Sequence, residues 1–165
     1  MIVTDVSVAA KWFINEELSD LAVSLADDCA TRREELIVPH LFYFEFTNIL
    51  RQQTIRGGMS PADANRILDE LLAFPVSVLP ATPVARAELH RAAFDIATRF
   101  GLRATYDAHY VALAEMNGCD LWTADQRLVR QLDGGLPFVR WIGDYDPPPG
   151  QTASSRSSGS KPRSR

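Results

Sequence analysis

The feature that most constrains the fold of this chain is an alternation of short apolar runs with longer helical patterns. Strand candidates of three or four residues lie at 2–4, 36–38, 76–79, 120–123 and 138–140. Helical patterns lie between and after them, at 7–13, 17–33, 40–55, 61–73, 83–100, 106–116 and 126–132. Such an alternation is typical of βαβ units, so we predict an α/β fold with a central parallel sheet of 4–5 strands.

Local residues predict several helix ends. Ser60 before Pro61 combines an N-cap serine with proline at the first helical position, and Thr82 before Pro83 repeats this order. Gly101 fits a left-handed C-cap. No strand candidate separates the helices at 40–55 and 61–73, so we expect them to form a small helical outgrowth from the sheet.

The length and composition predict one domain with a substantial core. The chain has 165 residues, of which 46% are apolar. No stretch approaches the roughly 18 consecutive apolar residues of a membrane span, and the chain opens on a strand candidate without a basic leader. We therefore expect a cytoplasmic protein. Cys29 and Cys119 form no CxxC pair, which favours buried reduced thiols over a zinc site or a disulfide.

The composition changes near Asp146, where three prolines are followed by Gly, Ser, Arg and Lys. We predict a folded domain at 1–146 and a disordered basic tail at 147–165. Residues 150–165 carry four positive charges and no acid, so the net charge of −4 leaves −8 for residues 1–149. An acidic domain does not attract nucleic acid through its overall field, so a polyanionic ligand would need local basic residues and metal ions.

Four acidic residues lie where folding does not require an acid. Asp5 and Asp125 directly follow strand candidates, and the carboxyl ends of parallel strands form the edge at which ligands bind. Asp107 lies at the start of the helix at 106–116, and Glu45 lies within the apolar run at 41–46. If the four side chains converge, they repel one another strongly unless a cation lies among them.

Each of these acids has an alternative explanation. The three aspartates could cap helices, since a carboxylate accepts hydrogen bonds from the first backbone N–H groups. Glu45 would share a helical face with apolar residues, and an unpaired buried carboxylate is costly. Asn48 is the nearest polar residue on that face, and an arginine from elsewhere is the other candidate partner for Glu45.

Four strings of residues resemble the PIN-domain ribonucleases of the VapC toxin type, across roughly residues 1–142. These strings are IVTDVS at 2–7, FEFTNIL at 44–50, TYDAHYVALA at 105–114 and LWTADQRL at 121–128. The resemblance implies a three-layer α/β/α sandwich. It also maps Asp5, Glu45, Asp107 and Asp125 onto an acidic metal-binding quartet, with Ser7, Asn48 and Thr123 at supporting positions.

The resemblance implies a Mg²⁺-dependent endoribonuclease, the toxin of a type II toxin–antitoxin system, with Mn²⁺ as a substitute ion. Oxygen ligands suit these ions better than zinc. We expect Asp5 and Asp107 to bind the ion directly, and Glu45 and Asp125 to hold its waters or a second ion. The hydroxyls of Ser7 and Thr123 could orient such ligands. The resemblance also implies 5′-phosphate and 3′-hydroxyl RNA products, a homodimer, and a VapB-type antitoxin that covers the acidic groove.

Basic, aromatic and histidine side chains offer weaker candidates. Six arginines flank the acids in the sequence and form either a basic rim for RNA or an ordinary exposed surface; they are Arg51, Arg56, Arg99, Arg103, Arg127 and Arg130. Four aromatic residues span most of a helical turn and are either wrapped within the monomer or part of an interface; they are Phe42, Tyr43, Phe44 and Phe46. We expect no catalytic role for Lys11 or for the three histidines, His40, His90 and His109.

Two other classes of protein deserve comparison. Phosphoryl-transfer proteins of the haloacid dehalogenase type also place an aspartate after the first strand, but Ser7 stands where they need a second acid. A receiver domain would need a phosphoacceptor aspartate after a middle strand. No aspartate directly follows the strand candidate at 76–79. A binding module whose acids only cap helices stays open, as do a nuclease outside a toxin–antitoxin system and a DNA-directed nuclease.

Overall fold

The computed structural model describes residues 1–132 and 134–148 and confirms the parallel sheet. Its strands are β1 (Ile2–Thr4), β2 (Leu36–Val38), β3 (Ser77–Val78), β4 (Leu121–Thr123) and β5 (Val139–Trp141). They lie in the order β3-β2-β1-β4-β5, and every neighbouring pair is parallel. All residues of β1 and β2 are buried, as expected of strands covered on both faces.

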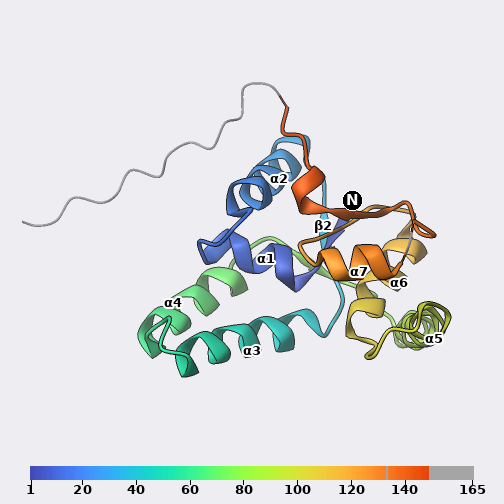
Figure 1. Ribbon diagram of the computed structural model, residues 1–165, viewed down its shortest axis with the longest axis horizontal. Helices are drawn as coiled ribbons and strands as arrows, with labels where there is room; N and C mark the ends of the chain where they lie inside the picture. Colours follow the sequence, from blue (N-terminus) through green and yellow to red (C-terminus); the bar gives the residue numbers. More distant parts are fainter. Residues whose placement is uncertain (133, 149–165) are drawn as a thin grey trace, which may run out of the picture.

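Helices cover the sheet on both sides. They are α1 (Val6–Phe13), α2 (Ser19–Arg32), α3 (Phe42–Ile55), α4 (Pro61–Leu72), α5 (Pro83–Phe100), α6 (Tyr106–Asn117) and α7 (Gln126–Gln131), and the 3₁₀ helix η1 (Ile142–Asp144) follows β5. α1 packs against α2 and α3, whereas α6 packs on β1 and β4 and is covered by α5 (Figure 1). Because residues 108–114 of α6 are all buried, this helix lies enclosed between the sheet and α5. The predicted α/β/α sandwich is confirmed.

The predicted helix caps and the helical outgrowth are also present. Ser60 Oγ accepts a hydrogen bond from the backbone N–H of Asp63 at 3.1 Å, and Thr82 Oγ1 accepts one from Ala85 at 3.3 Å. Gly101 ends α5 with a φ of +64°, which glycine adopts without strain. The α3–α4 pair lies at one end of the molecule and α5 at the other (Figure 1).

Some element bounds differ from the prediction. The strand expected at 76–79 contains only Ser77–Val78. The helix expected from residue 17 begins at Ser19, because Leu18 adopts a left-handed φ of +67°. The helix expected from residue 40 begins at Phe42, whose N–H closes a turn onto the carbonyl of Pro39 at 3.0 Å. β1, β2 and α5 have the predicted bounds, the remaining helices and strands differ by one residue, and η1 was not predicted.

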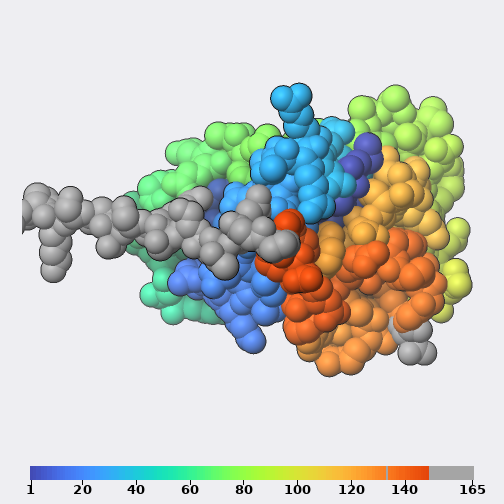
Figure 2. All heavy atoms as spheres, turned by 90° about the horizontal axis from the view of Figure 1, so that it is seen from above, coloured from blue at the N-terminus to red at the C-terminus, as the bar shows by residue number. Residues whose placement is uncertain are grey.

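The described chain ends against α2. The hydroxyl of Tyr145 donates a hydrogen bond to the buried carboxylate of Asp28 on α2, and its ring packs edge-on against Trp122 at 5.2 Å. Figure 2 shows the last described residues, in orange-red, beside α2. Apart from Pro147 and Pro148, the predicted tail lies outside the described residues. No helix in the described part is long and apolar enough to cross a membrane, and both cysteines are free.

Candidate active site

The four acids all lie at the starts of helices. Asp5 follows β1 and is the N-cap of α1, and Asp125 follows β4 and is the N-cap of α7. Because β1 and β4 are adjacent and parallel, these two residues lie at the same carboxyl edge of the sheet. Glu45 and Asp107 lie in the first turns of α3 and α6. A helix start favours negative charge, so the fold tolerates an acid at each position.

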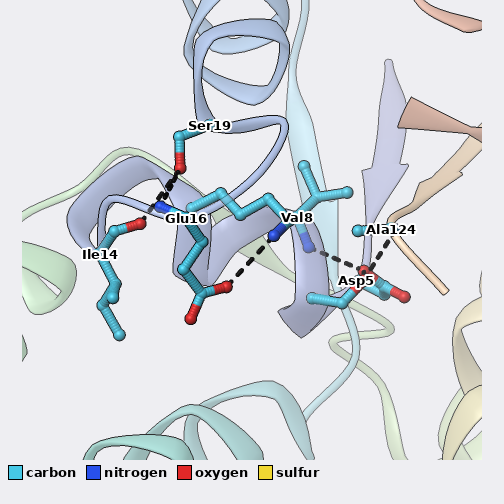
Figure 3. A network of polar contacts seen from close by, with 8 residues as sticks. Asp5, Val8, Ile14, Glu16, Ser19 and Ala124 are labelled. Atoms are coloured by element: carbon cyan, nitrogen blue, oxygen red, sulfur yellow. Dashed lines mark hydrogen bonds and ion pairs between the residues drawn. The ribbon is translucent and has the colours of Figure 1, made fainter. Parts of the chain in front are cut away.

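Hydroxyl groups fix the carboxylate of Asp5. This side chain is only 6% exposed. Its Oδ1 accepts hydrogen bonds from Ser7 Oγ at 2.6 Å and from the N–H of Val8 at 3.0 Å, and its Oδ2 accepts one from Thr123 Oγ1 at 2.5 Å. Figure 3 shows Asp5 beside Ala124 at the start of α1. Both carboxylate oxygens of Asp5 are therefore held in fixed directions.

The same hydroxyls reach the chain that follows β4. Ser7 Oγ accepts a hydrogen bond from the N–H of Ala124 at 2.8 Å, and Thr123 Oγ1 accepts one from the N–H of Asp125 at 2.9 Å. Each hydroxyl thus donates to Asp5 and accepts from the loop that carries Asp125. The loops after β1 and β4 are joined by these contacts.

Glu45 has an unexpected partner. Its Oε2 accepts a hydrogen bond from the hydroxyl of Tyr110 at 2.6 Å, and the Tyr110 side chain is 1% exposed. The arginine considered as a partner from the sequence is therefore wrong. Asn48 is exposed, and within the described part of the chain its side chain makes no hydrogen bond. Sequence reasoning missed Tyr110, although it lies three residues after Asp107 on α6.

Asp107 differs from the other two aspartates. Asp5 and Asp125 both accept backbone hydrogen bonds as N-caps, which confirms the capping role. The N-cap of α6 is Thr105, and Asp107 is exposed. Its carboxylate makes no hydrogen bond or ion pair with any residue that the structure describes. Capping therefore does not explain Asp107.

The acids act on one another electrostatically. Burial, with a smaller contribution from the charge of Asp107, raises the pKa of Asp5 to about 6 and that of Glu45 to about 7. The hydrogen bonds that each carboxylate accepts act in the opposite direction. The pKa of Asp107 is raised by partial burial and then by the charge of Asp125, while Arg127 lowers it. The pKa values of Asp5, Glu45 and Asp107 are therefore each raised in part by the charge of another carboxylate. We call Asp5, Glu45, Asp107 and Asp125 the acidic group.

The donors in the acidic group are chemically suited to a hard cation. In the described residues, no three His, Cys, Asp or Glu side chains lie close enough together to hold a metal ion as they stand. Mutual repulsion of like charges favours such spacing. The donors are carboxylate oxygens, which Mg²⁺ and Mn²⁺ prefer. Among described residues, Glu45 Oε1 and both oxygens of Asp107 have no hydrogen-bond partner, so they are available for a ligand.

Most of the other candidates lie apart from the acidic group. Among the described residues, Arg127 is the arginine that forms an ion pair with the group, with Nε 3.6 Å from Asp125 Oδ1. Arg99 instead lies over the ring of Phe100 at 4.9 Å, and Lys11 pairs with Glu16 at 3.2 Å.

The three histidines have structural contacts. His109 Nδ1 lies 2.6 Å from the carbonyl of Thr105, and its Nε2 lies 2.8 Å from His90 Nδ1. Since a ring N–H of His109 donates to the carbonyl, His90 donates to the other nitrogen. His40 Nε2 lies 3.1 Å from the carbonyl of Pro80. None of these contacts involves the acidic group.

Comparison with known proteins now identifies the family. The PIN domain model matches residues 2–133. The chain belongs to the PIN-domain family. The PIN domain is 33% identical over 132 residues to the ribonuclease VapC3 of Pyrobaculum aerophilum, covering 79% of this chain and 94% of that protein. It is 34% identical over 128 residues to the ribonuclease VapC9 of Mycobacterium tuberculosis, covering 78% of this chain and 88% of that one.

Solved structures share the fold. The crystal structure of PAE2754 from Pyrobaculum aerophilum matches the PIN domain with a TM-score of 0.57 and 26% identity, covering 86% of this chain and 89% of that one. VapC20 of Mycobacterium tuberculosis, described as a toxin that cleaves the sarcin–ricin loop, has a TM-score of 0.59 and 19% identity, covering 85% and 99%. The resemblance to VapC-type PIN domains inferred from the sequence is confirmed.

Proposed function

We propose that this chain is a divalent-metal-dependent endoribonuclease and the toxin component of a type II toxin–antitoxin pair. The observation that carries the proposal is the acidic group: four mutually repelling carboxylates at the carboxyl edge of the sheet, three with raised pKa values. Such a group is costly to keep for folding alone. The similarity of this chain to the VapC ribonucleases supports a nuclease over a binding module.

Each acid has a proposed role that follows from its environment. Asp107 has no competing partner in the described structure, so it is the most available direct ligand. Asp5 is the second, because Ser7 and Thr123 hold its oxygens in place. Glu45 and Asp125 would bind waters around the ion or a second ion. Asp125 already accepts two backbone hydrogen bonds through Oδ1, which leaves its Oδ2 for that purpose.

The reaction would be hydrolysis of an RNA phosphodiester. A divalent ion, Mg²⁺ or Mn²⁺, would supply a water of lowered pKa and stabilise the charge on the phosphoryl oxygens. Water adds to phosphorus, the bond to the 3′ oxygen breaks, and the products carry a 5′-phosphate and a 3′-hydroxyl. The acids orient the reacting groups, and Arg127, 86% exposed beside Asp125, can contact a neighbouring phosphate.

The proposed protein partners follow from the surface of the PIN domain. Phe42 and Phe46 are buried within the monomer, whereas Phe44 on the same helix is 79% exposed. A single exposed phenylalanine is common on protein surfaces, so our proposal that the chain forms a homodimer is based on its resemblance to the VapC-type proteins. A VapB-type antitoxin with a basic segment would suit the acidic group, since opposite charges steer association. Residues 1–149, which carry a net charge of −8, support that pairing.

The decisive experiment incubates purified protein, free of any antitoxin, with total RNA. Parallel samples contain Mg²⁺, Mn²⁺, EDTA, or Mg²⁺ with the Asp107→Asn variant. We expect discrete cleavage with either ion, and no cleavage with EDTA or the variant. Mapping the ends should give 5′-phosphates.

The outcomes separate the candidate functions. Cleavage that persists in EDTA would contradict metal dependence. In a further sample with DNA in place of RNA, cleavage of the DNA together with intact RNA in the other samples would favour the DNA-directed alternative. A folded wild-type protein that neither binds Mn²⁺ in a calorimetric titration nor cleaves RNA would leave the binding module as the better description.

A further inference from the structure

We propose that Tyr110 is a positioning residue of the site: its hydroxyl holds Oε2 of Glu45, so that Oε1 faces the divalent cation. This inference rests on the proposed metal dependence and adds a residue that the quartet of acids does not include. The carrying observation is the 2.6 Å hydrogen bond between a buried tyrosine on α6 and a carboxylate on α3, 65 residues apart in the chain.

The contact joins two helices that carry members of the acidic group. Within residues 1–132 and 134–148, it is the only hydrogen bond between α3 and α6. Asp107 lies three residues before Tyr110, so the two side chains lie on neighbouring parts of the same helix face. The hydroxyl therefore sets the position of Glu45 relative to Asp107.

The tyrosine is held rigidly while it makes this contact. Its side chain is 1% exposed, and the residues on both sides of it in α6 are also buried. Glu45 is fixed from its own helix, because Phe42 and Phe46 are fully buried and Phe46 packs edge-on against Phe13 of α1 at 5.8 Å. Since both backbones are anchored, the hydrogen bond determines the direction of the carboxylate.

The phenol can act only as a donor here. The Tyr110 hydroxyl donates to Oε2 of Glu45, and an ionised carboxylate has no proton to donate in return. A carboxylate accepts through both oxygens, and Oε2 is already engaged. In the described structure Oε1 has no partner, and the charges of Asp107 and Asp5 act on this carboxylate. Oε1 is thus the oxygen left to bind a cation or one of its waters.

The test is Tyr110→Phe, which keeps the ring and removes only the hydroxyl. We expect the affinity for Mn²⁺, measured by calorimetry on the purified full chain, to fall about tenfold or more, as for other groups that orient metal ligands. The Mg²⁺ concentration for half-maximal RNA cleavage should rise by the same factor. The rate at saturating Mg²⁺ should recover to within about threefold.

Tyr145→Phe is a matched control. Tyr145, which follows η1, also donates to a buried carboxylate, that of Asp28 on α2, and this pair lies outside the acidic group. The control variant should lose a similar hydrogen bond yet bind Mn²⁺ within about twofold of the wild-type protein. If both variants lose affinity equally, the effect comes from a general loss of packing and the inference is wrong.

A double-mutant cycle tests whether Tyr110 acts through Glu45. Adding Tyr110→Phe to Glu45→Gln should change the Mn²⁺ affinity by less than about twofold, because the carboxylate that Tyr110 orients is already gone. A full tenfold loss in the Glu45→Gln background would overturn the inference. The inference would also be wrong if Tyr110→Phe bound Mn²⁺ as tightly as a wild-type protein that binds Mn²⁺ and cleaves RNA. If the wild-type protein does neither, the proposed function itself fails.

A second measurement needs no variant at position 110, in case that variant does not fold. In protein labelled with ¹³C-tyrosine, titration with Mg²⁺ should shift the ring resonances of Tyr110 saturably, while those of Tyr145 stay in place. Unchanged Tyr110 resonances at saturating Mg²⁺ would contradict the inference.

Discussion

The two ends of the sheet treat acidic residues in opposite ways. At the amino end, Asp120 precedes β4 and pairs with Arg140 of β5 at 2.7 Å, and Glu34 pairs with the N-terminal amine at 3.1 Å. At the carboxyl end, the charge of one carboxylate raises the pKa of another, as that of Asp125 does for Asp107. Arg127 is the basic residue that contacts the acidic group in the described structure. Carboxylates paired with basic groups stabilise the protein modestly, whereas carboxylates without such partners favour the binding of a cation.

The largest expected difference between the two ends is in catalysis. We expect Asp107→Asn to lower kcat/KM for RNA cleavage by on the order of 1,000-fold, because a direct ligand is lost. Asp107 makes no hydrogen bond with described residues, so the variant should fold normally. Asp120→Asn at the other end should change kcat/KM by less than about twofold. Comparable losses in both variants, measured under saturating Mg²⁺, would remove the distinction between the ends.

A smaller effect is expected from a hydroxyl that supports the acidic group. Thr123→Val keeps the shape of the side chain but removes the hydrogen bond to Asp5 Oδ2 and the acceptor for the N–H of Asp125. We expect kcat/KM to fall about 10- to 100-fold. Thr123→Ser keeps the hydroxyl and should retain activity within a few-fold. If Thr123→Ser is as impaired as Thr123→Val, shape and not hydrogen bonding is responsible.

Glu45, at the carboxyl end, should make the stability of the folded protein depend on pH. The pKa of Glu45 is about 7 in the folded protein and 4.5 ordinarily. The folded state therefore binds an extra proton between these values, and this stabilising contribution is lost as the pH rises toward 7. Without metal, Glu45→Gln should melt about 2–5 °C above the wild-type protein at pH 8 and equally at pH 4.

The same variant should respond differently to metal. Adding Mg²⁺ at pH 8 should raise the melting temperature of the wild-type protein more than that of Glu45→Gln, since binding stabilises the folded state. Melting curves in EDTA and in Mg²⁺ check both statements. A melting difference in EDTA that does not change with pH would contradict the assigned pKa of Glu45.

The smallest effect is expected at the amino end. Asp120 and Arg140 are partly exposed, with 35% and 50% of their side chains accessible. Arg140→Gln should therefore lower the free energy of unfolding by only about 0.5 kcal/mol, and the difference should disappear near 1 M NaCl. Denaturant titrations at low and high salt measure it. A loss of several kcal/mol would show that this ion pair is as important to the fold as the core.

The sequence predicted the sheet well because its strands are short and the central ones, β1 and β2, are buried throughout. The caps at Ser60 and Thr82 were predictable because they depend on neighbouring residues. The partner of Glu45 was not, because Tyr110 meets it from another helix, 65 residues away, and no local pattern encodes that contact. Leu18 could not be predicted either, since a left-handed leucine is uncommon and is imposed by its surroundings.

The parallel pairing of β1 with β4 also affects when the acidic group can form during synthesis. The hydrogen bond between Thr123 and Asp5 spans 118 residues of chain, and contacts of such separation form late in folding. A ribosome-bound chain that has not yet extruded β4 has Asp5 without its Thr123 donor and has no Asp125 to complete the group. Under the proposed function, the growing polypeptide would therefore be inactive toward RNA until β4 and Asp125 have left the ribosome.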